Sequence, residues 1–268
     1  MPAASEPNAS KAIIRVKHLT AAYEGQLILD DVNFEVREGE VFVILGGSGS
    51  GKSTLLKHMI GLHPPTSGEI WVEDDNMVGA DEETRARILR KIGVMYQSGA
   101  LFGSLSLIEN VRLPLEEFTE LAGNAMDLIA RLKLRLVGLG GFENHMPSEL
   151  SGGMQKRAAI ARAMALDPRI LFLDEPSAGL DPITSAELDQ TIVRLARSLR
   201  MTFVVVTHEL PSIFAIADRV IMLDKRVRKI VATGRPSELR DRSENPWVRQ
   251  FFHRASEPLR EPQGGAVD

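Results

Sequence analysis

A glycine-rich stretch that directly follows an apolar run constrains this chain more than any other feature. The apolar run is Val41 to Leu45, and the stretch after it fits the pattern G-x-x-x-x-G-K-[ST] with the residues Gly46, Gly47, Ser48, Gly49, Ser50, Gly51, Lys52, Ser53 and Thr54. Because glycine has no Cβ, such a loop can bring many backbone N–H groups close to a polyphosphate. The alternative is a flexible Gly/Ser linker, but a linker would not lie between a buried strand and a helix. The stretch therefore predicts nucleotide binding.

Three residues at the end of this loop have predicted roles toward the nucleotide. Lys52 would bring a mobile positive charge to the β and γ phosphates, and Ser53 would offer a hydroxyl to Mg²⁺. Thr54 leads into the segment Leu55 to Ile60, whose pattern suits a helix with its positive N-terminus at the phosphates. A nucleotide with Mg²⁺ is the ligand that this arrangement predicts.

Composition places the chain among ordinary globular proteins. Its 268 residues are 44% hydrophobic and 25% charged, enough to bury a core as one domain or as a domain with a subdomain. The net charge of -4 argues against a surface built mainly for nucleic acid, because phosphate binding depends on clustered Lys and Arg. Cysteine is absent, which excludes disulfides, thiolate metal sites and cysteine nucleophiles.

Neither a membrane span nor a signal peptide is predicted. No apolar run approaches the roughly 20 residues needed to cross a bilayer, so a span would have to come from another chain. Residues Met1 to Lys11 are rich in Pro, Ala, Ser and Asn and lack an apolar core, which predicts a disordered start.

Two kinds of strand pattern predict two sheets. Segments Ile13 to Leu19 and Asn33 to Val36 alternate like half-buried strands, which predicts an antiparallel layer at the start of the fold. Continuously apolar runs are typical of parallel strands with helices on both faces. Such runs occur at Val41 to Leu45, Ile170 to Leu173 and Phe203 to Val206.

Helical patterns fill the segments between these strands. Asp181 and Pro182 suit the start of a crossover helix with one buried face, made of Leu188, Ile192, Leu195 and Leu199. The segment Leu107 to Glu149 lacks apolar strands and predicts a helical subdomain interrupted at Pro114, Gly123, Gly138, Gly140 and Gly141. The expected fold class is α/β, with an antiparallel β layer and an inserted helical subdomain.

A second chemical motif is the apolar run Ile170 to Leu173 followed by Asp174 and Glu175. Ligands bind at the carboxyl ends of parallel strands, so Asp174 would reach Mg²⁺ and Glu175 would polarise the attacking water. The alternative, a strand that ends in two solvated acids, loses weight because a phosphate loop is present.

A third motif is the segment Leu150 to Gln155, which is followed by a helical run from Lys156 to Ala163. Ser151 can cap this helix, while Gly152 and Gly153 leave backbone N–H groups open, which predicts a second anion site. Taken alone, a serine-capped helix without a ligand is the commoner case.

In this order, the segments resemble the Walker A, signature, Walker B and D-loop motifs of ATP-binding cassette (ABC) ATPases. They are Gly46 to Thr54, Leu150 to Gln155, Ile170 to Glu175 and Ser177 to Asp181, and the resemblance covers about residues 13–240. It implies an ABC-type P-loop NTPase fold, with ATP and Mg²⁺ as ligands. It also implies a head-to-tail dimer, in which ATP held by one P-loop is capped by Ser151, Gly152 and Gly153 of a second copy.

The same resemblance assigns four further residues, each with a structural alternative. Tyr23 matches an aromatic that stacks on adenine, although a strand tyrosine is nearly as well supported. Gln97 matches the Q-loop glutamine that touches Mg²⁺, and an exposed loop amide is its alternative. His208 matches the switch histidine near the γ-phosphate, where a structural histidine is the alternative. Asp181 matches the D-loop aspartate and can also cap the helix that begins at Pro182.

Two positions depart from the usual pattern of these motifs. Met154 stands where glutamine is usual in the signature, and Gly47 stands where proline is frequent. Neither change removes a phosphate donor, so ATPase activity is still expected.

A narrower resemblance rests on the segments Gln97 to Phe102, Met146 to Met154 and Asp181 to Thr184. They are similar to the ATPase subunits of Mla (maintenance of lipid asymmetry) and related Mce-type lipid transporters. This implies phospholipid cargo, a MlaE-like permease dimer, a MlaD-like periplasmic lipid-binding ring and a MlaB-like small STAS-domain protein. The chain would then lie at the cytoplasmic face of a bacterial inner membrane.

The expected ATPase domain spans residues 12–240, with the helical subdomain at about 98–165, and residues 241–268 form a C-terminal extension. Asn245 can cap a short helix with Pro246 at its first position and an apolar face of Trp247, Val248, Phe251 and Phe252. This face either docks on its own domain or, as we hypothesise, reaches a partner ATPase or accessory subunit. Residues beyond Ala255 are predicted to be disordered.

The predicted function is a transporter motor in which ATP closes the dimer and hydrolysis reopens it. One rival is an ABC ATPase of DNA repair or translation, but such proteins usually carry coiled-coil arms or two fused cassettes, and this chain shows neither pattern. A second rival is a soluble P-loop kinase, which would have no use for the segment Leu150 to Gln155 or for His208.

Overall fold

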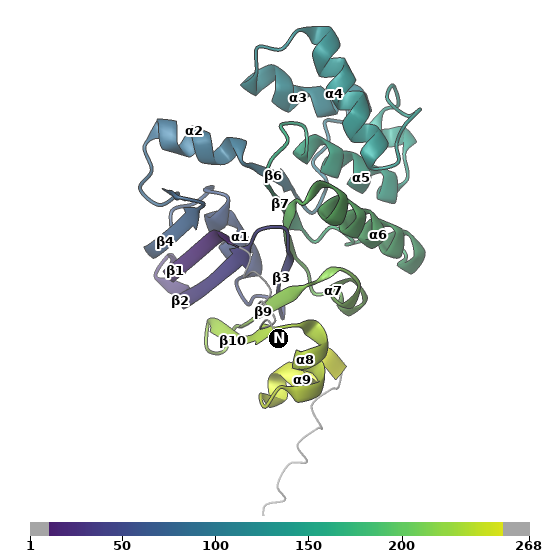
Figure 1. Cartoon of the computed structure of the whole chain (residues 1–268). Coiled ribbons are helices and arrows are strands. Elements are labelled where there is room, and N and C mark those ends of the chain that lie inside the picture. The colour runs from purple at the N-terminus through teal and green to yellow at the C-terminus, as the bar shows by residue number, and fades with distance from the viewer. Residues whose placement is uncertain (1–10, 254–268) are drawn as a thin grey trace, which may run out of the picture.

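A computed structural model describes residues 11–253, which form two sheets and a group of helices (Figure 1). The predicted disordered tail beyond Ala255 and all but the last residue of the predicted disordered start lie outside the described residues. Within residues 11–253, no helix is long and apolar enough to cross a membrane.

The first sheet is the expected antiparallel layer, with strand order β2-β1-β4-β5. Its strands are β1 (Ala12–Tyr23), β2 (Gln26–Arg37), β4 (Ser67–Val72) and β5 (Asp75–Asn76). Ile14 of β1 pairs with Val36 on one side and with Val72 on the other, and all three side chains are buried. The alternating pattern therefore marked the right segments, although both of the first strands are longer than predicted.

The second sheet has the order β10-β9-β3-β8-β7-β6. Its strands are β3 (Val41–Gly46), β6 (Ile92–Met95), β7 (Ile170–Asp174), β8 (Thr202–Val206), β9 (Arg219–Asp224) and β10 (Lys229–Gly234). The three predicted central strands, β3, β8 and β7, are adjacent and parallel, which confirms the α/β class. Strands β9 and β10 were not predicted, and only β10 is antiparallel to its neighbour.

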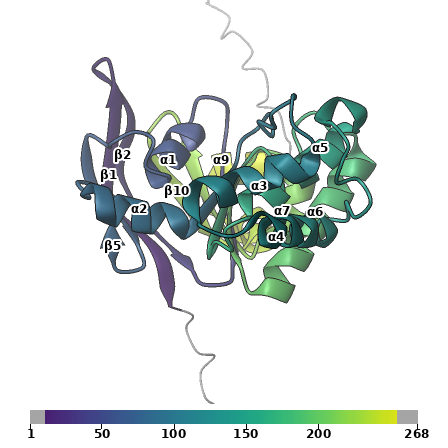
Figure 2. The ribbon, with the colours of Figure 1, turned by 90° about the horizontal axis from the view of Figure 1, so that it is seen from above.

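The core lies on both faces of this central sheet. Val41, Val43 and Leu45 of β3 join one apolar cluster, whereas Phe42 and Ile44 join the other. Every β3 side chain in these clusters is 0% exposed, because the antiparallel layer covers one face and helices cover the other. Figure 2 shows this division, with β1, β2 and α1 on one side and α3 to α6 on the other.

The helices are α1 (Lys52–Met59), α2 (Glu82–Arg90), α3 (Leu107–Phe118), α4 (Gly123–Leu136), α5 (Gly152–Ala163), α6 (Pro182–Leu199), α7 (Leu210–Ile216), α8 (Pro236–Arg242) and α9 (Pro246–His253). A short 3-10 turn, Pro147–Glu149, precedes α5. Helices α3, α4 and α5 pack together as the upper part of Figure 1 and correspond to the predicted helical subdomain.

Two details of the helix predictions are wrong. Pro114 lies inside α3 and does not end it, because Val111 and Leu115 bury the helix in the core and so offset the missing backbone donor. Leu199 is 41% exposed although it was assigned to the buried face of α6. The helix ends at this residue, and Arg200 turns the chain with a φ of 51°, so that Met201 takes the buried place instead.

The last helix docks on its own domain. The Oδ1 atom of Asn245 accepts a hydrogen bond from the Trp247 backbone N–H at 3.0 Å, which confirms the predicted cap. Val248 and Phe252 are 0% and 4% exposed, and the Phe252 ring lies 5.8 Å from the Phe214 ring of α7. The alternative, docking on its own domain, is therefore confirmed for Val248 and Phe252, and contact of the half-buried Trp247 and Phe251 with another subunit stays a prediction.

Candidate functional site

The glycine-rich loop joins β3 to α1 and is shaped by positions that exclude other residues. Gly46 has a φ of 153°, and a Cβ there would lie 2.5 Å from the Leu223 carbonyl oxygen and from Ser50 Oγ. Gly51 has a φ of 94°, and a Cβ there would lie 2.7 Å from the Leu29 side chain of β2. The central sheet and the antiparallel layer therefore hold the loop from two sides, as a phosphate cradle requires.

The polar groups of the loop divide into buried and open ones. Ser50 is 2% exposed, and its Oγ has no hydrogen-bond partner among the described residues. Ser48, Gly49 and Ser53 are exposed, while Gly47, Lys52 and Thr54 are half-buried. The hydroxyl of Ser53 is therefore open at the start of α1, where the helix dipole favours phosphate.

Lys52 lies folded against its own loop. Its Nζ donates hydrogen bonds to the carbonyl oxygens of Gly46 at 3.0 Å and Gly47 at 3.2 Å. Burial lowers the pKa of Lys52, and the negative charges of Glu175 and Asp174 oppose this effect. Its positive charge thus lies between the loop and the two acids, where a polyphosphate chain would be bound.

Asp174 and Glu175 are placed by the register between β7 and β8. Asp174 pairs with Val206, and the backbone N–H of Glu175 donates to the Val206 carbonyl oxygen at 2.8 Å. Glu175 has a φ of 46°, a left-handed conformation that is costly for a residue with a side chain and is common at functional sites. The sheet therefore fixes both acids at its carboxyl edge, as the sequence predicted.

Both acids have buried oxygens without a hydrogen-bond partner among residues 11–253. These atoms are Asp174 Oδ1 and Glu175 Oε2. Burial raises the pKa of Asp174, and the neighbouring charge of Glu175 adds to the rise. Buried oxygens of this kind are normally satisfied, so they are the places where a ligand would complete the site.

His208 meets Glu175 directly. It follows β8, and its Nδ1 lies 2.8 Å from Glu175 Oε1. The His208 side chain is 57% exposed, whereas that of Glu175 is 11% exposed, so the pair has a buried acid and an open imidazole. The structure therefore brings together two of the three residues expected to act in catalysis.

Gln97, the third, lies near Asp174. It follows β6, is exposed, and lines an open depression together with Asp174 and Gly179. The carbonyl oxygen of Gln97 accepts a hydrogen bond from Nζ of Lys156 in α5. The exposed amide and the carboxylate thus face the same space, as expected for the Q-loop reading.

Lys156 is a site residue that the sequence did not single out. It is 8% exposed, burial lowers its pKa, and the charges of Asp174 and Glu175 oppose that effect. Arg162, further along α5, donates to the Ala100 and Gly99 carbonyl oxygens at 2.7 and 3.0 Å. The signal available in the sequence was a lysine four residues before Ile160, on the buried side of the helix.

The donor set fits Mg²⁺. Asp174 offers a buried carboxylate oxygen without a partner, Gln97 an exposed amide and Ser53 an exposed hydroxyl. These are hard oxygen ligands, and Mg²⁺ bound with a nucleotide usually takes only one or two carboxylates together with phosphate oxygens and water. No cluster of three His, Asp or Glu side chains able to hold a metal occurs in the described chain, so phosphate would supply the remaining ligands.

The signature segment packs against the D-loop. Ser151 caps α5 by accepting the Met154 backbone N–H at 3.3 Å, and Ser151 and Gly152 are exposed. A Cβ at Gly152 would lie 3.3 Å from Leu180, and one at Gly153 would lie 2.3 Å from Thr184. Within the chain these glycines allow α5 to approach the start of α6. Ser151 and Gly152, at the N-terminus of α5, remain at the surface.

Asp181 is the N-cap of α6. Its Oδ1 accepts the backbone N–H groups of Ile183 at 3.0 Å and Thr184 at 3.1 Å. Hydrogen bonds from Thr184 and from the backbone lower the pKa of Asp181. The structural alternative for Asp181 is therefore confirmed, and its role toward a nucleotide stays a prediction.

Tyr23 ends β1 and is 41% exposed. Its ring is stacked with that of His58 in α1, with centroids 6.3 Å apart, and meets His63 edge-on at 6.1 Å. Burial lowers the pKa of His58, which favours its neutral form at this ring. An exposed aromatic beside the helix that begins at the phosphate loop suits an adenine platform, and this role stays a prediction.

Trp247 also lies beside the loop, which the sequence did not indicate. A Cβ at Gly47 would lie 4.0 Å from Cζ2 of the Trp247 ring. The guanidinium carbon of Arg226 lies 4.7 Å from the centre of the same ring, and Arg226 also bonds Asp224 at the end of β9. The C-terminal helix therefore contributes a wall to the glycine-rich loop.

A protein-family model and several known proteins match this chain. The family described as ABC transporter matches residues 29–178. Over 240 residues the chain is 40% identical to the "Probable ribonucleotide transport ATP-binding protein mkl" of Mycobacterium leprae, covering 90% of this chain and 68% of that protein. It is 39% identical over 227 residues to the "Intermembrane phospholipid transport system ATP-binding protein MlaF" of Haemophilus influenzae, covering 85% of each chain. The MlaF of Escherichia coli K12 is 37% identical over 256 residues, covering 94% of each chain.

Solved structures agree with the fold. The ATP-binding cassette MJ0796, in a dimeric post-hydrolysis state bound to ADP and Pi, superposes with a TM-score of 0.74 at 34% identity. That match covers 83% of this chain and 98% of the other. CbiO1 from Clostridium perfringens, part of the transporter complex cbiONQ, has a TM-score of 0.79 at 28% identity and covers 91% of this chain and 95% of the other.

Proposed function

Because the chain belongs to the ABC transporter family, we propose that it is the ATP-hydrolysing subunit of a transporter that moves phospholipid between the inner and outer membranes of a bacterium. The observation that carries the ATPase part is the contact of His208 with Glu175 at 2.8 Å, beside Asp174 and across from Lys52. These residues stand where an ATP γ-phosphate, its Mg²⁺ and an attacking water would need charge and a base.

Each residue has a distinct task in this proposal. Lys52 leaves the Gly46 and Gly47 carbonyl oxygens and binds the β and γ phosphates of ATP. Glu175 accepts the proton of the water that attacks the γ-phosphate, and His208 orients the Glu175 carboxylate through its Nδ1 contact. When bound, Mg²⁺ neutralises the charge that develops on the phosphate oxygens, and Asp174, Gln97 and Ser53 are the residues that would hold it.

The products are ADP and inorganic phosphate, and the remaining predicted residues would complete the pocket. Backbone N–H groups from Gly46 to Thr54 bind the phosphates, and Tyr23 stacks on adenine. Ser151, Gly152 and Gly153 of a second copy close over the γ-phosphate, with Asp181 in the D-loop at the same junction. The position of Ser151 supports this arrangement, because its side chain caps α5 while Ser151 and Gly152 are exposed at the surface.

The phospholipid part rests on how the relatives match. The alignments with the proteins named MlaF cover 85–94% of this chain and the same share of each relative. The mycobacterial proteins named for ribonucleotide transport are 40% identical, but this chain spans only about two thirds of their length. Ribonucleotide transport is the second candidate, and the higher identity favours it only slightly.

The proposed assembly has four kinds of component. Two copies of this chain form the head-to-tail motor, and a MlaE-like permease dimer receives its motion. A MlaD-like periplasmic ring binds lipid, and a MlaB-like STAS-domain protein joins the cytoplasmic side. The chain would lie at the cytoplasmic face of the inner membrane, and α5, which bonds the Q-loop through Lys156 and Arg162, would pass movement between the ATP site and the permease.

Co-expression with the neighbouring reading frames tests the proposal. The complex is purified from membranes by a tag on this chain and reconstituted into vesicles. ATP-dependent movement of fluorescent phospholipid is then compared with uptake of a labelled ribonucleotide. The proposal expects phospholipid movement that stops in a Glu175→Gln complex. Ribonucleotide uptake without lipid movement would support the second candidate, and a chain that purifies without any membrane protein would contradict both.

A further inference from the structure

A pocket that the ATPase mechanism does not use lies between α6 and α7. It has a volume of about 590 Å³, which is within the range of small-molecule sites. One end is formed by the D-loop residues Gly179 and Leu180, and Glu209 lies beside the switch histidine His208. The pocket therefore lies between the helix that follows the D-loop and the helix that follows the switch histidine.

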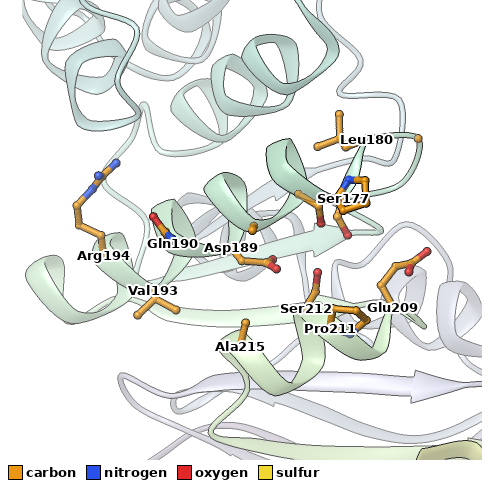
Figure 3. Close-up of a pocket in the computed structure, with 14 residues that line it drawn as sticks. Ser177, Leu180, Asp189, Gln190, Val193, Arg194, Glu209, Pro211, Ser212 and Ala215 are labelled. Atoms are coloured by element: carbon orange, nitrogen blue, oxygen red, sulfur yellow. The ribbon is translucent and has the colours of Figure 1, made fainter. Parts of the chain in front are cut away.

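The pocket contains buried polar groups without partners. Asp189 of α6 is 4% exposed and Ser212 of α7 is 2% exposed. No hydrogen bond of good geometry reaches Asp189 Oδ1 or Ser212 Oγ within residues 11–253, although Ser212 lies close enough to Asp189 to oppose the effect of burial on its pKa. Figure 3 shows the two side chains on facing walls, pointing toward one another across the pocket. Groups of this kind are costly when unpaired, and a ligand that bonds both would remove the cost.

The electrostatics of the pocket favour a cation. Its charged lining residues are Asp189, Glu209 and Arg194, and Figure 3 shows the last two at opposite ends. Burial raises the pKa of Asp189 to about 6, so the carboxylate is mostly ionised at neutral pH. No ion pair joins Asp189 to Arg194 in the described part of the chain, and α7 itself carries no charged residue. The middle of the pocket therefore holds a buried carboxylate that has Ser212 beside it and no ion-pair partner among the described residues.

The walls decide what kind of cation fits. Leu180, Val193, Pro211 and Ala215 line the space around Asp189 with aliphatic surface. A metal ion would need several hard ligands, and the described chain groups no three acidic or imidazole side chains that could hold one. An organic cation needs only one carboxylate, a hydroxyl and apolar walls.

We propose that this pocket is a binding site for a small organic cation, an ammonium or guanidinium group carried on a short apolar body. The cation donates hydrogen bonds to Asp189 Oδ1 and Ser212 Oγ, and its apolar body lies against Val193 and Ala215. An occupied pocket joins α6 to α7, and so links the D-loop to the switch segment. This site is separate from the nucleotide site and does not depend on the identity of the transported cargo.

Calorimetric titration of the full-length protein with butylguanidinium tests the proposal. Butyramide and butyrate serve as neutral and anionic matches of similar size. We expect the cation to bind and the two matches not to bind. Binding should weaken as the pH falls below about 6, because protonation of Asp189 removes the negative charge that the cation contacts. Glu209 and Arg194 are the other charged groups that line the pocket.

Two variants localise the effect. Asp189→Asn keeps the shape of the side chain and should lower the affinity about tenfold or more, since a hydrogen bond to a charged group is lost. Glu187→Gln removes the same charge from an exposed position of the same helix and should leave the affinity unchanged. Circular dichroism of both variants excludes a folding defect.

Several outcomes would overturn the proposal. Butyramide binding as tightly as butylguanidinium would show an apolar pocket without charge selection. An unchanged affinity in Asp189→Asn would place the cation elsewhere, and the absence of binding by the cation at millimolar concentration would show that the pocket holds water only. A short arginine peptide that binds more tightly than butylguanidinium would reassign the pocket to a side chain of a partner protein.

Discussion

The Nδ1 atom of His208 lies 2.8 Å from Oε1 of Glu175, although 33 positions separate the two residues in the sequence. The register of β7 on β8 creates this contact, because Asp174 pairs with Val206 and both strands end at the same edge. The acid is nearly buried and the imidazole is open, so the pair has one side toward the protein and one toward a ligand.

Glu175→Gln should retain ATP binding and lose turnover. The amide keeps the size of the side chain but cannot accept a proton, and a general base contributes about 100- to 10,000-fold to a rate. We expect phosphate release to fall by that order and ATP to hold the protein as a dimer in size-exclusion chromatography. Glu209→Gln, which alters a more exposed neighbour of His208, is the control and should reduce the rate far less. Rapid hydrolysis by the Glu175 variant would remove it as the base.

Lys52→Ala should weaken nucleotide binding itself. The half-buried Lys52 ammonium is held at the glycine-rich loop by its hydrogen bonds to the Gly46 and Gly47 carbonyl oxygens. Loss of one charge-assisted phosphate contact is worth about 1.5–3 kcal/mol, or roughly 10- to 150-fold in affinity. Fluorescent-nucleotide titration measures it. Lys17→Ala, at an exposed position of β1, should bind as the unchanged protein does, and equal losses in both variants would contradict a specific role for Lys52.

Lys156→Met should loosen the Q-loop from α5. Methionine keeps the length and apolar stem of the buried side chain but removes the donor to the Gln97 carbonyl oxygen. We expect faster amide hydrogen exchange in the segment Gln97 to Ala100 and a smaller effect of the permease on ATPase rate. Arg157→Met, at the next position of α5, is the matched control. Unchanged exchange in the Lys156 variant would show that Arg162 alone holds the loop.

Trp247→Ala should raise the KM for ATP more than it lowers kcat, because the ring forms a wall of the loop at Gly47 and is not placed at the reacting atoms. Trp247→Phe should restore most of the affinity by refilling the wall. The chain has two tryptophans, so a Trp71→Phe background leaves Trp247 as the only one. Its fluorescence should then change on ATP addition, and a silent signal together with an unchanged KM would refute the contact.

Asp189→Asn should stabilise the protein at neutral pH. The pKa of Asp189 rises from 3.8 to about 6 on folding, chiefly through burial, so the folded state holds the proton more tightly than the unfolded state. Stability contributed by this group is therefore lost as the pH rises from about 4 to above 6. The shift of about two units corresponds to about 3 kcal/mol at most. Urea unfolding of the ligand-free proteins should show the variant more stable at pH 7 and equal below pH 4, and parallel pH profiles would contradict this.

Much of the fold could be predicted because its signals are local. The continuous apolar runs of β3, β7 and β8 indicate strands buried on both faces, and the alternation in β1 indicates a strand buried on one face. Each pattern can be recognised within its own segment. Strands β9 and β10 were missed because no motif marked them, although β9 is buried on both faces. Pro114 was wrongly predicted to interrupt the helix, because the rule that proline breaks a helix takes no account of the packing of Val111 and Leu115.

The residues of the candidate site also divide into those that local sequence predicts and those that it does not. Lys52, Asp174, Glu175 and His208 follow strand ends, so sequence order and sheet geometry together place them at one edge. Lys156, Trp247 and Asp189 were not predicted, because their importance arises from elements distant in the chain. Nothing near Trp247 in the sequence indicates Gly47, and nothing near Asp189 indicates Ser212.

The glycine-rich loop has one neighbour that is synthesised before it and one that is synthesised long after it. Leu29 of β2 lies against Gly51, and Trp247 of α9 lies against Gly47. A nascent chain that has completed β3 and α1 already holds every phosphate-binding residue of the motif but lacks β8, β9 and Trp247. The loop therefore gains these surroundings only after α9 has been synthesised. A chain that ended before α9 would therefore hold every residue of the motif around a loop that is open on its Gly47 side.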